Sequence, residues 1–261
     1  MKVYEFGDET DPVIMLLPGT CCYWKTNFGE VIPLLREKFR VCAVSYDGFD
    51  ETENTTFPTM LEEVAKIEDY ILEKHGGHVC AVYGCSLGGS FVGLLAARER
   101  ITMDHGILGS SDLDQAGKFK TGLLVKIGVP LLYPMIHDGE FKKGFMKKRA
   151  EKSMQENGEY GRKFMGMMKG PYGNGMPFVS RESVANQFGS DMITPLPDNI
   201  APKHGDIHIF YALKMGGKYR ARYLLHFAHP VIHEHDLRHE ELLACYPEKW
   251  VSEVERICGV K

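Results

Sequence analysis

The fold of this chain is decided by one stretch, His78–Gly89, which has the sequence HVCAVYGCSLGG. Its first half is a run of strand-forming residues without polar alternation, and this pattern is typical of a strand buried on both faces. Small and apolar residues continue to Ala97 and predict a helix. The turn between the predicted strand and helix is GCSLG, residues 84–88.

This turn has the Gly-x-Ser-x-Gly pattern of a nucleophile elbow. Such a turn is so sharp that a side chain two residues before or after the serine would collide with its neighbours, and Gly84 and Gly88 avoid that collision. Ser86 then stands at the start of a helix, where unpaired N–H groups and the positive end of the helix dipole stabilise a developing oxyanion. We therefore expect Ser86 to be a catalytic nucleophile and the N–H of Leu87 to be the first oxyanion donor. A tight turn with a purely structural role is the alternative.

With this motif in its strand–turn–helix context, the chain resembles the α/β-hydrolase superfamily, and most closely its small bacterial serine esterases and lipases with an inserted helical cap. The resemblance covers most of the chain outside one central segment. It implies the α/β-hydrolase fold, an α/β architecture with a mostly parallel, doubly wound sheet. It also implies a hydrolase that cleaves carboxylic esters through an acyl-enzyme. We expect no cofactor.

The composition is that of one globular domain, because 261 residues, 44% of them hydrophobic, are enough for a single large core. A formal net charge of −4 gives no reason to expect a nucleic-acid partner. The charged N-terminal residues lack the apolar core of a signal peptide, and no run approaches the ~18 to 20 apolar residues of a membrane span. We therefore expect a cytoplasmic protein without an integral membrane segment, which acts on a small-molecule ester or a lipid-like substrate.

Strand and helix patterns alternate along the first half of the chain. Residues 12–17 and 40–46 are predicted buried strands, and the segment 27–39 between them has the apolar spacing of an amphipathic helix. This strand–helix–strand order predicts a parallel sheet. After a strand over 101–109, no clear strand–helix order returns until a strand begins at residue 206.

The intervening segment 115–205 needs structure of its own, because an unstructured loop of almost ninety residues is uncommon inside a compact domain. We predict that it forms a helical cap, inserted before the penultimate strand. The α/β core then consists of residues 1–114 and 206–261.

Two features of the predicted cap concern its ligands. It contains eight of the thirteen methionines, whose flexible thioether chains suit an irregular apolar pocket. Met165 and Met168, together with Cys21 and Cys85, are predicted to contact the substrate; packing of the cap on the core is the alternative role of the methionines.

Residues 142–152 carry six Lys or Arg against one Glu. We interpret this run as a solvated helix face, and attraction of an anionic substrate or a lipid surface is the alternative.

A serine hydroxyl needs a base within hydrogen-bond reach to act as a nucleophile. In the chain order Ser, acid, His, the base comes from the loop after the last strand. His239 is the predicted base because it follows that strand by a short loop and precedes the final helix, which begins at Pro247; the resembling esterases place their catalytic histidine there.

His233 and His235 lie in the strand itself and lack a third ligand, so we expect no metal site. The seven cysteines include no Cys-x-x-Cys pair and indicate neither a zinc site nor a disulfide framework.

The acid that completes a Ser–His–acid triad is the least well defined of the predicted catalytic residues. The resembling family usually carries it after the strand that ends near Leu213, where residues 214–218 contain no carboxylate. Asp112 is the predicted acid, because it ends the neighbouring strand, adjacent strand ends lie only about 5 Å apart, and a minority of lipases with this fold use that position. Asp114 and Asp236 are the other candidates. Asp112 has the alternative role of capping the first helix of the cap.

The second oxyanion donor is implied by the same resemblance. In the family, the loop after the first buried strand begins His-Gly, and the next residue donates its N–H. Here the loop is Pro18-Gly19-Thr20, so the predicted donor is Thr20, with Cys21 as the alternative. Members of the superfamily also hydrolyse thioester, amide and C–C bonds, and some only bind ligands, so these activities remain alternatives to ester hydrolysis.

Overall fold

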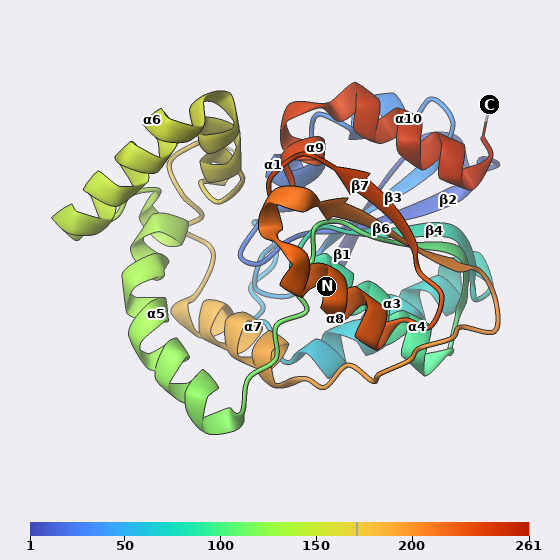
Figure 1. Ribbon diagram of the computed structural model, residues 1–261, viewed down its shortest axis with the longest axis horizontal. Coiled ribbons are helices and arrows are strands. Elements are labelled where there is room, and N and C mark those ends of the chain that lie inside the picture. Colours follow the sequence, from blue (N-terminus) through green and yellow to red (C-terminus); the bar gives the residue numbers. More distant parts are fainter. Residues whose placement is uncertain (171, 261) are drawn as a thin grey trace.

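The centre of the protein is a seven-stranded sheet with the strand order β1-β3-β2-β4-β5-β6-β7 (Figure 1). This computed structural model describes residues 1–170 and 172–260. The strands are β1 (Lys2–Phe6), β2 (Val13–Leu17), β3 (Arg40–Ser45), β4 (His78–Gly84), β5 (Thr102–Leu108), β6 (Asp206–Ala212) and β7 (Val231–His235). β1 runs antiparallel to β3, and every other pair of neighbouring strands is parallel. The prediction of a mostly parallel α/β sheet is confirmed.

Helices cover both faces of this sheet. The described helices are α1 (Trp24–Phe28), α2 (Ile32–Leu35), α3 (Met60–His75), α4 (Leu87–Arg98), α5 (Lys118–Asp138), α6 (Gly144–Met167), α7 (Arg181–Ile193), the short 3-10 helix η1 (Leu213–Met215), α8 (Gly217–His226), α9 (Glu241–Cys245) and α10 (Pro247–Cys258). α1, α2 and α10 lie on one face, and α3, α4 and α8 lie on the other (Figure 1). The sheet is therefore doubly wound.

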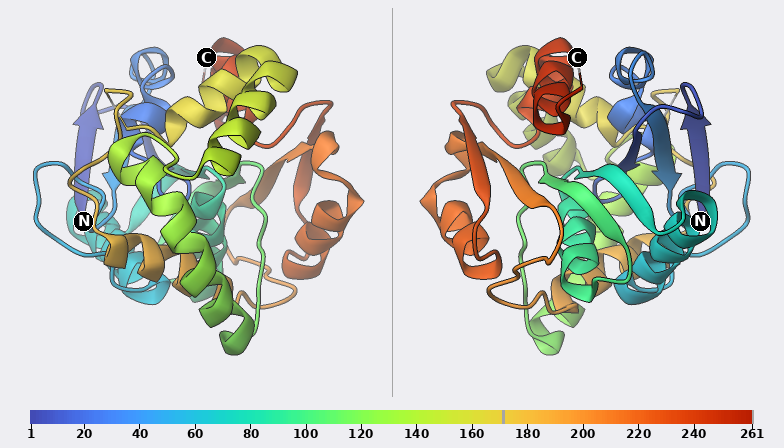
Figure 2. Two further views of the ribbon diagram at one scale, coloured as in Figure 1. Left: turned by 90° about the vertical axis from the view of Figure 1, so that its left-hand side faces the viewer. Right: turned by 90° about the vertical axis from the view of Figure 1, so that its right-hand side faces the viewer.

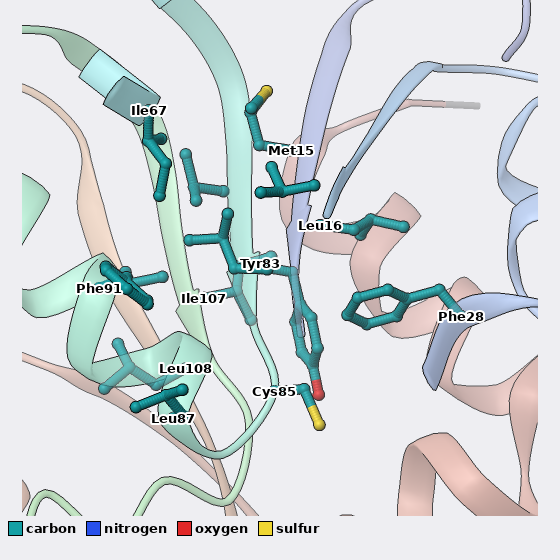
Figure 3. Close-up of a cluster of buried hydrophobic side chains, with 14 of the residues drawn as sticks. Met15, Leu16, Phe28, Ile67, Tyr83, Cys85, Leu87, Phe91, Ile107 and Leu108 are labelled. Atoms are coloured by element: carbon teal, nitrogen blue, oxygen red, sulfur yellow. The ribbon is translucent and has the colours of Figure 1, made fainter. Parts of the chain in front are cut away.

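Large side chains pack on both faces to form the core (Figure 3). On the α10 face, the ring of Tyr83 contacts Phe28 and Trp250 edge to face, with centroids 6.2 and 4.7 Å apart. On the opposite face, Ile67 of α3 and Phe91 of α4 are fully buried. Burial of a side chain of this size contributes about 1.5–3 kcal/mol. This packing holds β4, and with it the turn that follows β4, in a fixed position.

The strand order reverses between β2 and β4, since the chain proceeds from β2 to β3 on one side and from β4 to β5 on the other. In open α/β sheets, ligands bind in the crevice at the carboxyl ends of the strands where the order reverses. The loop after β2 begins at Pro18, and the turn after β4 contains Ser86. The two motifs with catalytic potential in the sequence therefore lie at this crevice.

The predicted single helix over 27–39 is wrong, because the chain forms the separate short helices α1 and α2. Pro33 explains the break. In a continuous helix its ring would clash with the carbonyl of Gly29, and it has no N–H to donate to that oxygen. Pro33 instead lies in the first turn of α2, where a missing N–H leaves no hydrogen bond unmade.

The segment between β5 and β6 contains α5, α6 and α7. α5 and the first half of α6 project from one side of the molecule, at the left in Figure 1 and toward the viewer in the left panel of Figure 2. α6 is kinked at Gly158, which has a left-handed φ of 56°. α7 contacts both α5 and α3, and its Ser183 hydroxyl accepts a hydrogen bond from the N–H of Phe57 (3.2 Å). The end of this segment is thus bonded to the core.

α5 bears on the expectation about membrane segments. By length and composition alone it could cross a membrane, with a mean hydropathy of 1.3 over an 18-residue window. Its uninterrupted apolar runs are shorter than a membrane span, because Lys126 divides them, and only the average over the window is high. Only 22% of the window is buried, and α5 is the one helix of this kind in residues 1–170 and 172–260.

Candidate active site

Ser86 has the strained backbone of a nucleophile elbow, with φ 49° and ψ −108°. The two glycines of the motif are required by close backbone contacts. A Cβ on Gly84 would lie 2.1 Å from the backbone of Gly88, and a Cβ on Gly88 would lie 2.2 Å from the carbonyl oxygen of Leu17. These contacts are the collisions expected from the sequence, and Ser86 begins α4 at the carboxyl end of β4.

The structure brings His239 to Ser86. His239 Nε2 lies 3.1 Å from Ser86 Oγ, within hydrogen-bond distance. The loop that carries His239 joins β7 to α9 and is held by α6. The Tyr160 hydroxyl donates to the carbonyl oxygen of His239 (3.0 Å), and the ring of Phe164 meets the imidazole edge to face at 5.9 Å. A distance of this size is what proton transfer from a serine hydroxyl to an imidazole requires.

The three candidate acids differ in their relation to His239. Asp112 Oδ1 lies 4.0 Å from His239 Nδ1, which is an ion-pair distance longer than a hydrogen bond. Desolvation raises the pKa of Asp112, and the nearby His239 partly opposes that shift. Asp114 pairs with Arg222, and the exposed Asp236 lies 3.7 Å from the ammonium of Lys214. Within the described residues, neither Asp114 nor Asp236 contacts His239.

Arg222 of α8 restrains the loop after β5. Its guanidinium donates to the carbonyl oxygen of Asp112 (2.7 Å) while pairing with the carboxylate of Asp114. In addition, the Tyr223 hydroxyl donates to the carbonyl oxygen of Ser111 (2.5 Å). These bonds fix the backbone of Asp112 and leave its half-exposed side chain without a hydrogen bond to a neighbour in the described part of the chain.

The loop after β2 presents one free amide to the site. Its Gly19 N–H donates to Asn27 Oδ1 (2.9 Å), and its Cys21 N–H donates to Gln187 Oε1 (2.7 Å). Cys21, the alternative oxyanion donor, is therefore already engaged. Within residues 1–170 and 172–260, the N–H groups of Thr20 and Leu87 have no hydrogen-bond acceptor.

Sequence reasoning missed Glu240, which is buried directly behind the elbow. Its Oε1 accepts from the N–H groups of Ser86 and Ser110, both at 2.8 Å, and its Oε2 accepts from the Tyr83 hydroxyl at 2.9 Å. One carboxylate thereby joins the ends of β4 and β5 to the His239 loop. The only signal in the sequence is that Glu240 follows the predicted base, and a charged residue in a predicted loop is usually exposed.

Two backbone features make this position for Glu240 possible. A Cβ on Gly109 would lie 2.4 Å from Glu240 Oε1, so only glycine fits at the end of β5. Glu240 itself has a left-handed φ of 55°, an unfavourable conformation for a residue with a side chain. The conformation persists because three hydrogen bonds stabilise it.

An apolar cavity of about 240 Å³ opens beside Ser86 and His239. The loop after β2 contributes Thr20, Cys21 and Cys22, and the helices between β5 and β6 contribute Val129, Leu132, Ile136, Phe164, Met167, Met168, Val184 and Phe188. Cys21, Cys85 and Met168, which are predicted to contact the substrate, line the cavity. Met165 does not line it, and Met167 does, because residues two apart on a helix point about 200° away from each other.

The cysteines around the cavity are not activated. Burial raises the pKa of the Cys22 thiol to about 12, and it raises the pKa values of Cys21 and Cys85 further. Glu240 beside Cys85 acts in the same direction. Since the thiolate is the nucleophilic form of cysteine, these residues act as small apolar groups in the cavity wall.

The described residues contain no group of three His, Cys, Asp or Glu side chains placed to hold a metal ion. His233 Nε2 lies 3.1 Å from His208 Nδ1 on β6, and His235 pairs with Glu253 of α10 at 3.2 Å. Both histidines therefore belong to the packing between the sheet and α10.

Comparisons with known proteins agree with this architecture. A family model described as the alpha/beta hydrolase fold matches residues 12–127. No curated protein matches the chain by sequence. Among solved structures, the chain is similar to an α/β hydrolase family protein from Desulfitobacterium hafniense, with a TM-score of 0.75 and 18% identity over 98% of this chain and 99% of that chain.

Two further structures have named activities. One is an esterase from Exiguobacterium antarcticum, with a TM-score of 0.71 and 14% identity over 98% of this chain and 94% of that chain. The other is an enol-lactonase from Burkholderia xenovorans LB400, with a TM-score of 0.62 and 13% identity over 99% of this chain and 96% of that chain. At these identities the likeness concerns the fold. The chain therefore has the α/β-hydrolase fold, and the family model matches that fold over residues 12–127.

Proposed function

We propose that this protein is a serine hydrolase that cleaves carboxylic esters through an acyl-enzyme. The observation that carries the proposal is the 3.1 Å distance between His239 Nε2 and Ser86 Oγ, at a nucleophile elbow that opens into an apolar cavity. The α/β-hydrolase fold supports hydrolase activity in general, and the cavity supports a substrate with an apolar acyl group. A cytoplasmic location stays a prediction.

The reaction follows from the positions of these groups. Ser86 Oγ attacks the ester carbonyl carbon while His239 Nε2 accepts the hydroxyl proton, and the N–H groups of Leu87 and Thr20 bind the oxyanion. The C–O bond to the alcohol then breaks, and His239 returns the proton to the leaving oxygen. A water molecule attacks the acyl-enzyme with His239 again as base, which releases the carboxylic acid and restores Ser86.

We propose Asp112 as the residue that orients the imidazole of His239 and stabilises its charged form. Hydrogen bonds of catalytic groups are often long in structures without substrate and shorten in the complex. A small rotation of the Asp112 side chain would close the 4.0 Å gap, and that side chain has room because it is half-exposed.

We propose that residues 115–205 act as a cap that selects the acyl group. Helices α5, α6 and α7 provide most of the apolar wall of the cavity. Its volume of about 240 Å³ is below the ~300–1,000 Å³ that is typical of pockets for drug-sized ligands. The expected substrates are therefore esters with short to medium acyl chains, and lactones, which are cyclic esters, belong in the same screen.

The test is covalent labelling of the folded protein with a fluorophosphonate, followed by intact mass measurement and peptide mapping. We expect one adduct on Ser86, no adduct on Ser86→Ala, and labelling that is strongly slowed in His239→Ala. Ester turnover should follow the same order. A folded wild type that neither labels nor hydrolyses any ester would overturn the proposal and favour a ligand-binding role, whereas labelling without ester turnover would favour thioester, amide or C–C bond hydrolysis.

A further inference from the structure

The outer face of α5 exposes a stripe of large apolar side chains. Phe119, Leu123 and Ile127 are spaced four residues apart on one side of the helix, and 91%, 52% and 56% of their surfaces are exposed. Leu124 beside them and Phe145 at the start of α6 are exposed as well. These five residues form what we call the α5 outer face.

The inner face of the same helix is already occupied. Val129, Leu132 and Ile136 point toward the cavity beside Ser86 and form part of its wall. α5 is thus apolar on two sides, and within the described residues only the inner side is covered. Because its inner side packs on the folded protein, α5 has only its outer side available to a partner.

Positive charge is concentrated around the α5 outer face. Residues 118–152 carry nine Lys or Arg against three Asp or Glu, a net charge of +6 in a chain whose total is −4. Lys118, Lys120 and Lys126 lie on α5 itself, and the remaining six lie in the run 142–152. Among the described residues, seven of the nine form no ion pair; the exceptions are Lys142 with Asp138 and Lys152 with Glu156.

The helices that carry the apolar stripe and the basic run are on the same side of the molecule. α5 and the first half of α6 both project toward the viewer in the left panel of Figure 2. A helix with apolar side chains on its exposed face and lysines beside them is the pattern of an interfacial helix, which buries its apolar side chains at the boundary between lipid headgroups and acyl chains.

We propose that the α5 outer face, with the basic first half of α6, docks on the surface of a bilayer that contains anionic lipids. The apolar side chains would enter the headgroup region, and the lysines would pair with lipid phosphates. A second copy of this chain fits less well, because a two-fold contact would bring two surfaces of charge +6 against each other. A nucleic acid would match the charge and leave the exposed Phe119, Leu123 and Ile127 without a partner.

The experiment is flotation of the full chain with two kinds of vesicle, phosphatidylcholine alone and phosphatidylcholine mixed with phosphatidylglycerol. We expect binding to the anionic vesicles to exceed binding to the neutral ones by at least about tenfold, and to weaken as salt is raised. The Ser86→Ala variant should bind as the wild type does, so the result does not depend on hydrolytic activity.

Three variants separate the contributions. Phe119→Ser combined with Leu123→Ser and Ile127→Ser is expected to weaken binding at least about tenfold, and replacing Lys118, Lys120 and Lys126 by Gln is expected to weaken it about a hundredfold. The matched control replaces Leu224 and Leu225, two equally exposed leucines on α8, by Ser and should leave binding unchanged. Circular dichroism and thermal unfolding establish that each variant is folded.

Three outcomes would overturn the proposal. Absence of binding to anionic vesicles, or equal binding to both kinds of vesicle that the α5 substitutions do not change, would show that this face is not a lipid-docking surface. A wild-type dimer that the triple Ser variant converts to monomer, without any effect on flotation, would assign the face to contact between copies of the chain. If the protein failed to hydrolyse esters, that result would contradict the proposed catalytic function and leave the docking proposal unaffected.

Discussion

The two loops that meet at His239 carry carboxylates of opposite character. In the loop after β7, Glu240 is buried and accepts three hydrogen bonds, from two backbone N–H groups and the Tyr83 hydroxyl. In the loop after β5, Asp112 is half-exposed and lies 4.0 Å from the imidazole it would assist. The carboxylate of Glu240, which holds backbone groups together, is buried and fully bonded, whereas the carboxylate of Asp112 keeps room to move.

The largest expected effect comes from removing the buried carboxylate. Glu240→Ala leaves two backbone N–H groups and a hydroxyl without acceptors, and we expect it to lower the free energy of unfolding by about 3 kcal/mol. Because the elbow and the His239 loop lose their common contact, turnover should fall about a hundredfold. Denaturant unfolding and ester kinetics measure the two effects.

Glu240→Gln is the matched control for that change. Its amide oxygen can accept both N–H bonds, and its NH2 group can donate to the Tyr83 oxygen, so most of the stability should return. If Gln and Ala were equally destabilising, the negative charge of Glu240, and not its role as hydrogen-bond acceptor, would hold the two loops together.

Low pH should destabilise the sheet through His208 of β6. Burial, with help from His105 and His233, lowers the pKa of His208 from 6.5 to about 4, and Asp206 opposes the shift. Since the pKa of His208 is lower in the folded state, the unfolded chain binds more protons between pH 6.5 and 4. The contribution of neutral His208 to stability is therefore fully present above pH 6.5 and is lost as pH falls through that window. The loss from His208 amounts to about 3 kcal/mol.

Urea unfolding at several pH values measures this loss. His208→Gln keeps a polar partner for His233 and cannot be protonated, so its unfolding free energy should depend less on pH between 6.5 and 4. An unchanged pH dependence would mean that groups other than His208 control acid stability.

Asp112→Asn tests the exposed carboxylate. We expect turnover to fall about ten- to a hundredfold, while the free energy of unfolding stays within about 0.5 kcal/mol of the wild type, because the side chain is half-exposed and forms no hydrogen bond with a described neighbour. Asp114→Asn is the control and should leave turnover nearly unchanged. Equal losses in both variants would assign the effect to the shared partner Arg222.

The smallest expected effect is that of Cys85→Ala, next to the nucleophile. The neutral, buried thiol receives one weak hydrogen bond from Asn27 at 3.4 Å, so turnover should change less than about threefold and stability by about 1 kcal/mol. Iodoacetamide should leave Cys21 and Cys85 unmodified in the folded protein, because burial raises their pKa values. Rapid alkylation with loss of activity would show that a thiol takes part in the reaction.

Local sequence was sufficient wherever a few neighbouring residues determine the geometry. The steric needs of the turn after β4 require Gly84 and Gly88, and so predict the position of Ser86. The apolar runs predict the parallel strands in the same local way, because a strand that is buried on both faces is apolar along its whole length. The helix predicted over 27–39 from apolar spacing is wrong because Pro33 interrupts it.

The sequence by itself thus determined the sheet, the elbow and a short set of candidates for base and acid. Only the tertiary structure decided that Glu240 is buried, that Asp112 stands 4.0 Å from His239, and that Met167 lines the cavity in place of Met165. Glu240 is 154 residues from Ser86 along the chain and 130 from Ser110. Contacts over such separations depend on how strands and helices pack, and packing leaves no periodic pattern in the local sequence.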